Sequence, residues 1–165
     1  MSSYRGAVHA AIVAKIQAAQ ATGQPLAIVR STSFFPAIFP TFAALAPEAY
    51  PAITLMPERG KTKFFTTGVP PALADGFMFK IVLAVREGKP VLGLLGDPTQ
   101  SPPVVGLYDL EAALKNVIEA DQSLGGTQGV QKVLCVDDEY DYTFYPTVLQ
   151  KITVNVTGQL TTQSH

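Results

Sequence analysis

The chain has 165 residues, a length typical of one domain, and we expect that domain to span residues 1–158. With 12 basic and 13 acidic residues its net charge is −1, which excludes a general electrostatic attraction to nucleic acid or to an anionic membrane. The single cysteine, Cys135, excludes an intrachain disulfide and a metal site built from several cysteines.

The chain carries few charges for its size. Charged residues make up 15% of it, whereas about 25% is usual. Two interpretations remain open: partners cover part of the surface, or the surface is rich in serine, threonine and glutamine. No apolar run reaches the ~18 residues that cross a bilayer, and residues 1–5 lack the apolar core of a signal peptide. We therefore expect a protein made in the cytoplasm, with no membrane partner.

The first predicted element is a helix over residues 5–21. Val8, Ile12 and Ile16 recur every fourth residue among many alanines, which have the best helix propensity. A glycine and a proline soon after it are typical of residues that end a helix. The apolar run 26–29 is a candidate short strand.

Residues 31–57 combine five prolines with five aromatic residues. Prolines oppose a long helix or a central strand, and aromatic residues oppose simple disorder. We expect an irregular arm or insertion that packs on the domain or on a neighbour, with a strand over residues 51–56 near its end.

A small basic group follows this arm. Arg59, Lys61 and Lys63 lie close together in the sequence, and we expect residues 58–63 to form a charged turn. Three basic side chains could contact phosphates or line a channel that carries DNA, and a merely solvated turn is the other interpretation. A loop is expected over residues 68–76.

The middle of the chain predicts a strand and a helix. Residues 77–86 alternate with a period of two, which is typical of a strand with one buried face. A turn at 87–90, a short apolar run at 91–95 and a loop at 96–103 come next. A second helix then begins with Asp109 as its N-cap. Its apolar stripe consists of Leu110, Leu114, Val117 and Ile118.

Two more strands are predicted, over residues 130–136 and 147–157. In the second, Val148, Ile152, Val154 and Val156 share one face. Residues 159–165 are polar and are expected to form a flexible tail. The expected fold class is α+β: a mainly antiparallel sheet with two α-helices packed on one face, plus the irregular segment rich in proline and aromatic residues.

An acidic and aromatic segment, residues 137–146, is expected to be a loop between these two strands. Its acidic residues are Asp137, Asp138, Glu139 and Asp141, and its aromatic residues are Tyr140, Tyr142, Phe144 and Tyr145. The acidic spacing differs from that of an EF-hand calcium loop, so we expect no metal. The aromatic residues either form a contact surface, as they do in protein interfaces, or close one end of the core.

Catalytic equipment is sparse in the sequence. The two histidines are His9, in the first helix, and His165, the last residue, whereas a nucleophile–base pair needs an imidazole held beside the nucleophile. The glycine-rich segments match neither of the common phosphate-binding motifs. We therefore expect no enzyme activity, no catalytic residue and no cofactor.

The order of elements is suggestive of one protein family. After the first helix come Ala49-Tyr50-Pro51-Ala52-Ile53-Thr54-Leu55, the strand over 77–86, a helix opening Gly106-Leu107-Tyr108-Asp109-Leu110, and a last strand with Gln150-Lys151-Ile152-Thr153-Val154-Asn155-Val156. This layout resembles the tail-terminator (tail-completion) proteins of long-tailed bacteriophages, and more loosely other head–tail joining proteins.

The resemblance implies a structural virion protein that is assembled in the host cytoplasm and located in the tail or neck. It implies a homohexameric ring that caps the tail tube and joins it to the head or neck. Its partners would be further copies of the chain, the tail tube protein and a head–tail connector or neck protein, with only non-specific contact to DNA in the lumen. The candidate interface or lumen residues are Arg59, Lys61, Lys63, Asp137, Asp138, Glu139, Tyr140, Asp141 and Tyr142.

A different class of protein remains open at this point, a small ligand-binding or enzymatic α+β domain. The glycine- and proline-rich loop over residues 93–106 precedes the second helix, and the N-terminus of that helix could hold an anion.

Overall fold

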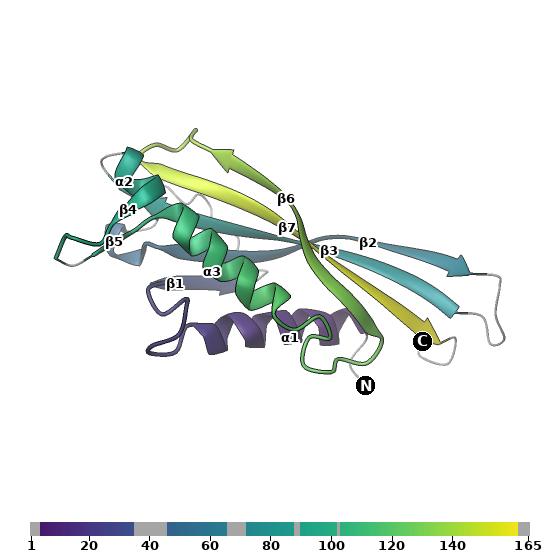
Figure 1. Cartoon of the computed structure of the whole chain (residues 1–165). Coiled ribbons are helices and arrows are strands. Elements are labelled where there is room, and N and C mark those ends of the chain that lie inside the picture. The colour runs from purple at the N-terminus through teal and green to yellow at the C-terminus, as the bar shows by residue number, and fades with distance from the viewer. Residues whose placement is uncertain (1–3, 35–45, 66–71, 88–89, 102, 162–165) are drawn as a thin grey trace.

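The computed structural model describes residues 4–34, 46–65, 72–87, 90–101 and 103–161, which form a long sheet with helices on one face (Figure 1). The helices are α1 (Tyr4–Ala19), α2 (Pro90–Leu95) and α3 (Leu107–Glu119), with a short 3-10 helix η2 (Pro47–Ala49). The strands are β1 (Ser31–Phe34), β2 (Ala52–Phe65), β3 (Ala72–Arg86), β4 (Gly96–Asp97), β5 (Val104–Val105), β6 (Val130–Asp141) and β7 (Thr147–Thr161).

The main sheet contains five strands among the described residues, in the order β1-β2-β3-β7-β6. β3 is antiparallel to both β2 and β7, and β6 is antiparallel to β7, whereas β1 is parallel to β2. The short strands β4 and β5 form a separate ladder. These observations confirm the predicted α+β class with a mainly antiparallel sheet.

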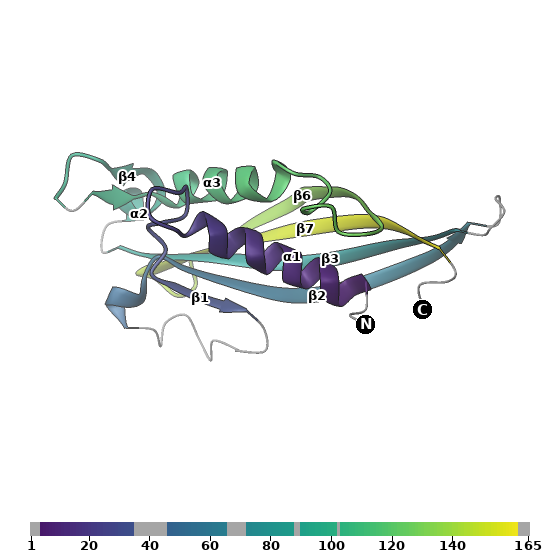
Figure 2. The ribbon, with the colours of Figure 1, turned by 90° about the horizontal axis from the view of Figure 1, so that it is seen from below.

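The two long helices lie on the same face of the sheet and contact each other (Figure 2). The alternation predicted for residues 77–86 is confirmed, because every second residue of β3 from Phe77 to Val85 lies in the core under the helices. The helices supply apolar residues at helical spacing, as predicted, except that Leu107 was not among the predicted residues and Val117, which was, is only partly buried. Those that are fully or almost fully buried are Val8, Ile12, Ile16, Leu107, Leu110, Leu114 and Ile118.

The other face of the sheet is free of these helices, and we call it the open face. A second, smaller group of buried residues lies there, consisting of Tyr50, Ala52, Val82, Ala84 and Leu149. Thr54 and Thr153 on the same face are also buried. The end of the sheet near Ala52 is therefore buried on both faces.

Two predicted loop segments are strands in the structure. β2 continues through the predicted turn at 58–63, so that Arg59 lies opposite Met78 and Phe65 lies opposite Ala72. A β-bulge between Pro57 and Arg59 leaves Glu58 without a partner residue. Proline is tolerated in this stretch because β2 has no described strand on its outer side beyond Leu55. Residues 72–76 belong to β3, and residues 66–71 lie outside the described residues.

The last two strands are longer than predicted. β6 includes Asp137–Asp141, so the predicted loop over 137–146 is reduced to the turn at 142–146. β7 continues to Thr161, which lies opposite Ala72, and residues 159–161 are therefore strand and not tail. The reason is the length of β3, which provides β7 with a pairing partner to its end. Residues 162–165 lie outside the described residues.

Two shorter predictions are wrong, the turn at 87–90 in part and the strand at 26–29. Pro90 begins α2, which includes the apolar run at 91–95 and is followed by Gly96, whose positive φ of +72° suits glycine. Residues 26–29 form turns because Leu26 is buried and its backbone N–H donates to the carbonyl of Ala19, so the segment folds back on α1. Within the arm predicted at 31–57, β1 and η2 are short regular elements, and the strand predicted near its end is the start of β2. Residues 35–45 lie outside the described residues, so the arm itself stays a prediction.

The N-cap of α3 is Gly106 and not Asp109. A Cβ atom at position 106 would overlap the backbone of residues 94–96, so the chain crosses itself closely at this point. The helix starts directly after the crossing, which leaves Asp109 in its first turn. A carboxylate there still interacts favourably with the positive end of the helix dipole.

The core position of α3 gives a test of this packing. Leu114 is completely buried, so Leu114→Ala should lower the free energy of unfolding by roughly 2–5 kcal/mol through lost burial and a residual cavity. The matched control is Asn116→Ala on the exposed side of the same helix, which should change it by less than about 0.5 kcal/mol. Urea unfolding followed by circular dichroism measures both, and equal effects would contradict the assigned orientation of α3.

Candidate assembly interface

The acidic run of the sequence is divided between the two faces of the sheet. β6 has a β-bulge at Val136, between Cys135 and Asp137, which shifts the alternation of the strand by one residue. Beyond the bulge, Asp138 and Tyr140 lie opposite Ile152 and Gln150 on the helix-covered face. Asp137, Glu139 and Asp141 lie opposite Thr153, Lys151 and Leu149, at register positions of the open face. The sequence therefore identified this cluster, but the structure does not bring its members to one site.

On the helix-covered face, the acidic residues join a polar network with α3. Lys115 Nζ lies 2.5 Å from Glu111 Oε1 and 2.7 Å from Asp138 Oδ2. The hydroxyl of Tyr140 donates to Glu111 Oε2 over 2.6 Å, and Gln150 Nε2 donates to that hydroxyl over 3.2 Å. This network ties the outer strand β6 to the helix above it.

The network contains residue types that catalyse reactions in other proteins, but their pKa values are shifted away from neutrality. Burial opposes the charge on Lys115, yet the hydrogen bonds to Asp138 and Glu111 raise its pKa. Burial and the hydrogen bond to Glu111 raise the pKa of Tyr140. Burial and the neighbouring Glu119 carboxylate raise the pKa of the Cys135 thiol to about 12. A general base or an activated nucleophile needs the opposite shifts, so these groups are suited to fixing the structure.

On the open face, Lys151 is the partner of the acidic residues. Its Nζ atom lies 3.0 Å from Asp141 Oδ2 and 3.9 Å from Glu139 Oε1. Hydrogen bonds from the side chain and backbone of Thr143, together with Lys151, hold the pKa of Asp141 at about 2. Glu139 remains largely exposed, with 68% of its side chain accessible.

The basic residues predicted for a turn lie on strand β2. Arg59, Lys61 and Lys63 occupy alternate positions, opposite Met78, Gly76 and Ala74. Alternate positions of a strand belong to the same face of a sheet. This face is the open face. Met78 lies on the same side of β3 as Lys80, and Lys80 lies opposite Thr153, which belongs to the open face.

The β6–β7 turn, α2 and the start of α3 lie at one end of the molecule (Figure 1), and each of them carries exposed apolar residues. We call this surface the aromatic end; its residues are Val91, Leu95, Tyr108, Tyr142, Phe144 and Tyr145. Tyr140 lies instead against the core. Its ring packs edge-on against that of Tyr108, with 5.8 Å between the two ring centroids. The core interpretation is thus confirmed for Tyr140, whereas Tyr142, Phe144 and Tyr145 are exposed and available for contact.

The sequence did not identify Val91, Leu95 and Tyr108 as surface residues. Val91 and Leu95 are 64% and 61% exposed, although they belong to an apolar run. Only for Tyr108 did the sequence contain an indication of exposure, because this residue lies outside the apolar stripe that begins at Leu110.

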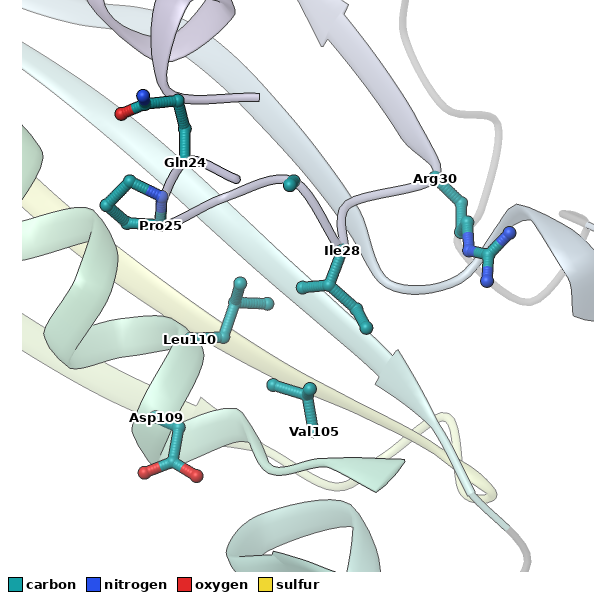
Figure 3. A pocket seen from close by; sticks show the side chains of 8 residues that line it. Gln24, Pro25, Ile28, Arg30, Val105, Asp109 and Leu110 are labelled. Carbon is teal, nitrogen blue, oxygen red and sulfur yellow. The ribbon is translucent and has the colours of Figure 1, made fainter. Parts of the chain in front are cut away.

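A shallow cavity of about 630 Å³ lies between the segment after α1 and the start of α3 (Figure 3). Its apolar lining includes Pro25, Ile28, Val105 and Leu110. Arg30 and Asp109 lie at opposite ends of it. The carboxylate of Asp109, in the first turn of α3, disfavours an anion at the N-terminus of that helix, where the sequence left an anion site open.

Among the described residues, no group of three or more histidine, cysteine, aspartate or glutamate side chains is arranged to hold a metal ion. Within the same part of the chain, no helix is both long and apolar enough to cross a membrane.

No protein-family model matches the sequence, and no curated protein matches it. The fold is similar to that of a chain in a solved structure described as the virion of a native gene transfer agent (GTA) particle. The TM-score is 0.55 at 15% sequence identity, and the likeness covers 97% of this chain and 100% of that chain. At this identity the likeness concerns the fold.

The network around Glu111 predicts a pH dependence of stability. Burial raises the pKa of Glu111, but the hydrogen bonds from Lys115 and Tyr140 outweigh it and lower the pKa from 4.5 to about 2. The folded state therefore gains stability from this carboxylate above about pH 4.5 and loses it as the pH falls towards 2. Glu111→Gln should be less stable than the unchanged protein at pH 6, and the difference should shrink at pH 3. Urea unfolding at both pH values measures it, and a difference independent of pH would contradict the assigned network.

Proposed function

We propose that this chain is a structural subunit of a phage-like virion, where it forms a homohexameric ring that caps the tail tube and joins it to the head or neck. The observation that carries the proposal is the similarity of fold, over nearly the whole of both chains, to a chain of the GTA virion. The layout of elements that resembles tail terminators supports the more specific role in the tail.

The surface chemistry supports an assembled state. A monomer that functions alone rarely exposes several large apolar side chains at one place, whereas docking surfaces do so. At the aromatic end, Tyr142 and Tyr145 are 50% and 54% exposed. Aromatic side chains are enriched at interfaces, and we assign this end to contact with the tail tube protein or the neck protein.

The titratable groups also support a structural role. The described lysine, tyrosine and cysteine side chains with resolved pKa shifts are all moved away from the range in which they act as bases or nucleophiles. A ring subunit needs no nucleophile and no cofactor. We propose a single domain over residues 1–158, which the end of β7 extends to Thr161, with residues 31–57 as an arm. We expect only non-specific contact with DNA in the lumen.

The ring itself is testable on purified protein. Native mass spectrometry and negative-stain electron microscopy should detect closed oligomers of six copies, formed alone or on addition of tail tubes. Monomers under all of these conditions would overturn the proposed function.

The aromatic end has a separate test. Tyr142→Ser combined with Phe144→Ser removes two exposed rings, so the unfolding midpoint of the subunit should change little. Co-sedimentation with tail tubes should fall by at least about tenfold in affinity, since buried aromatic anchors carry much of the binding energy of an interface. Ring formation should persist, and unchanged tube binding would remove this surface from the proposed contact.

The alternative function, a ligand-binding domain, rests on the cavity between the segment after α1 and α3. Its volume lies within the range of small-molecule sites. Since Asp109 disfavours an anion at the α3 N-terminus, a phosphate would have to bind at the Arg30 end of the cavity, and a nucleotide or phosphorylated metabolite bound there would raise the unfolding temperature. A shift produced by one such ligand, together with a monomeric protein, would favour this function over the ring.

A further inference from the structure

The two outer strands of the main sheet differ in how much of their edge is covered. β1 pairs with residues 52–55 of β2 and leaves Met56–Phe65 without a strand on the outer side among the described residues. At the other side of the sheet, β6 is the outermost strand. An edge of this kind presents unpaired backbone groups that can extend the sheet with a strand from another chain.

The first half of the β6 edge is closed by side chains. The backbone N–H of Val133 donates to Gln122 Oε1 over 3.0 Å, and that of Cys135 donates to Glu119 Oε1 over 2.7 Å. From Asp138 to Asp141, the described contacts include no such cap on the backbone. The available part of this edge is therefore its acidic end, beyond the bulge at Val136.

The two available edges carry opposite charges in matching positions. On β2, Arg59, Lys61 and Lys63 occupy every second position of the open face. On β6, Asp137, Glu139 and Asp141 also occupy every second position of that face. Because β6 runs antiparallel to β2, a neighbouring copy that continues the sheet would place the three acidic residues opposite the three basic ones, from Asp141–Arg59 to Asp137–Lys63. Opposite charges across a strand pair are stabilising, and like charges are destabilising.

The pairing requires a stagger between copies. In the register of one chain, Glu139, Lys151, Val82 and Thr54 form one row, and Lys61 lies about six pairing positions beyond Thr54. At about 3.3 Å per residue, these six positions correspond to a shift of about 20 Å along the strand direction. Across the sheet, the four strands β2, β3, β7 and β6 span about 19 Å. This corresponds to a strand tilt of about 45°, which is within the range of closed β-barrels. Without stagger, Lys61 would face Lys132, a like charge.

We propose that neighbouring copies of this chain join edge to edge through antiparallel pairing of β2 residues 59–63 with β6 residues 137–141, and that three opposite-charge pairs fix the register. The proposal rests on the ring function and deepens it, because it names the two complementary faces of each subunit. A heterologous contact of this kind, repeated by rotation, closes into a ring.

Charge reversal tests the pairing. The first variant carries Lys61→Glu and Lys63→Glu, and the second carries Asp137→Lys and Glu139→Lys. Each variant alone should need at least about tenfold higher concentration for half-assembly, because like charges then face each other. An equimolar mixture of the two should assemble as the unchanged protein does, since every contact in a mixed ring again joins opposite charges. Matched controls are Arg30→Glu with Arg86→Glu, and Glu48→Lys with Asp109→Lys, which alter exposed charges elsewhere and should leave assembly unchanged.

Crosslinking tests the register. In a Cys135→Ala background, Lys61→Cys with Glu139→Cys should give a ladder of covalent oligomers with a short bis-maleimide. The pair Lys61→Cys with Lys132→Cys, which reports unstaggered pairing, should give none.

The outcomes separate this inference from the ring function. Rings that persist in both charge-reversed variants, or crosslinking only through position 132, would overturn the pairing and leave the ring function standing. An unchanged protein that stays monomeric alone and with tail tubes would overturn the ring function, and the pairing with it.

Discussion

The pairing of β3 with β7 is the contact on which the rest of the molecule is built. Both strands are 15 residues long and pair along their whole length. On one face, Phe79, Ile81, Ile152 and Val154 are completely buried under the two long helices. The strands extend about 50 Å, whereas the 16 residues of α1 extend about 24 Å. The helices therefore cover only part of the sheet, and β2, β3 and β7 continue beyond them (Figure 1). A second difference in length concerns the edge, since β1 pairs only with residues 52–55 of β2 and leaves the rest of β2 without an outer strand among the described residues.

One irregularity decides where the acidic residues lie. Without the bulge at Val136, Asp137 would follow the alternation of Val133 and Cys135 into the core. The bulge instead sends Asp138 to Lys115 and Glu139 and Asp141 to Lys151, so that one short acidic run serves two functions. One set ties β6 to α3, and the other gives the open face an acidic edge. The bulge at Glu58 has the corresponding effect on β2, because the basic residues beyond it take positions of the open face.

The parts of the fold that could be predicted are those in which a local pattern and the final environment agree. Ile12 in α1 and Leu114 in α3 each belong to a set of apolar residues at helical spacing, and Phe79 and Ile81 belong to a set at strand spacing. In each case the spacing along the sequence identifies the residues that are buried. The prediction was wrong where a local signal for a turn was overruled by a partner strand. Pro57, Gly60 and the charges around them are typical of a turn, but the length of β3 provides a ladder that keeps them extended. Val91 and Leu95 could not be identified as exposed, because an apolar pair in a short helix looks the same whether it faces the core or the solvent.

By itself, the sequence determined the α+β class, the two packed helices and the period of the central strands, because each depends on spacing along one segment. Only the tertiary structure decided which residues share a face. Face assignment in a sheet changes with every inserted residue, so the bulges at Glu58 and Val136 control it, and the alternation of either strand alone does not reveal them. The division of the acidic run between the helix-covered face and the open face follows from register, which exists only once β6 is paired with β7.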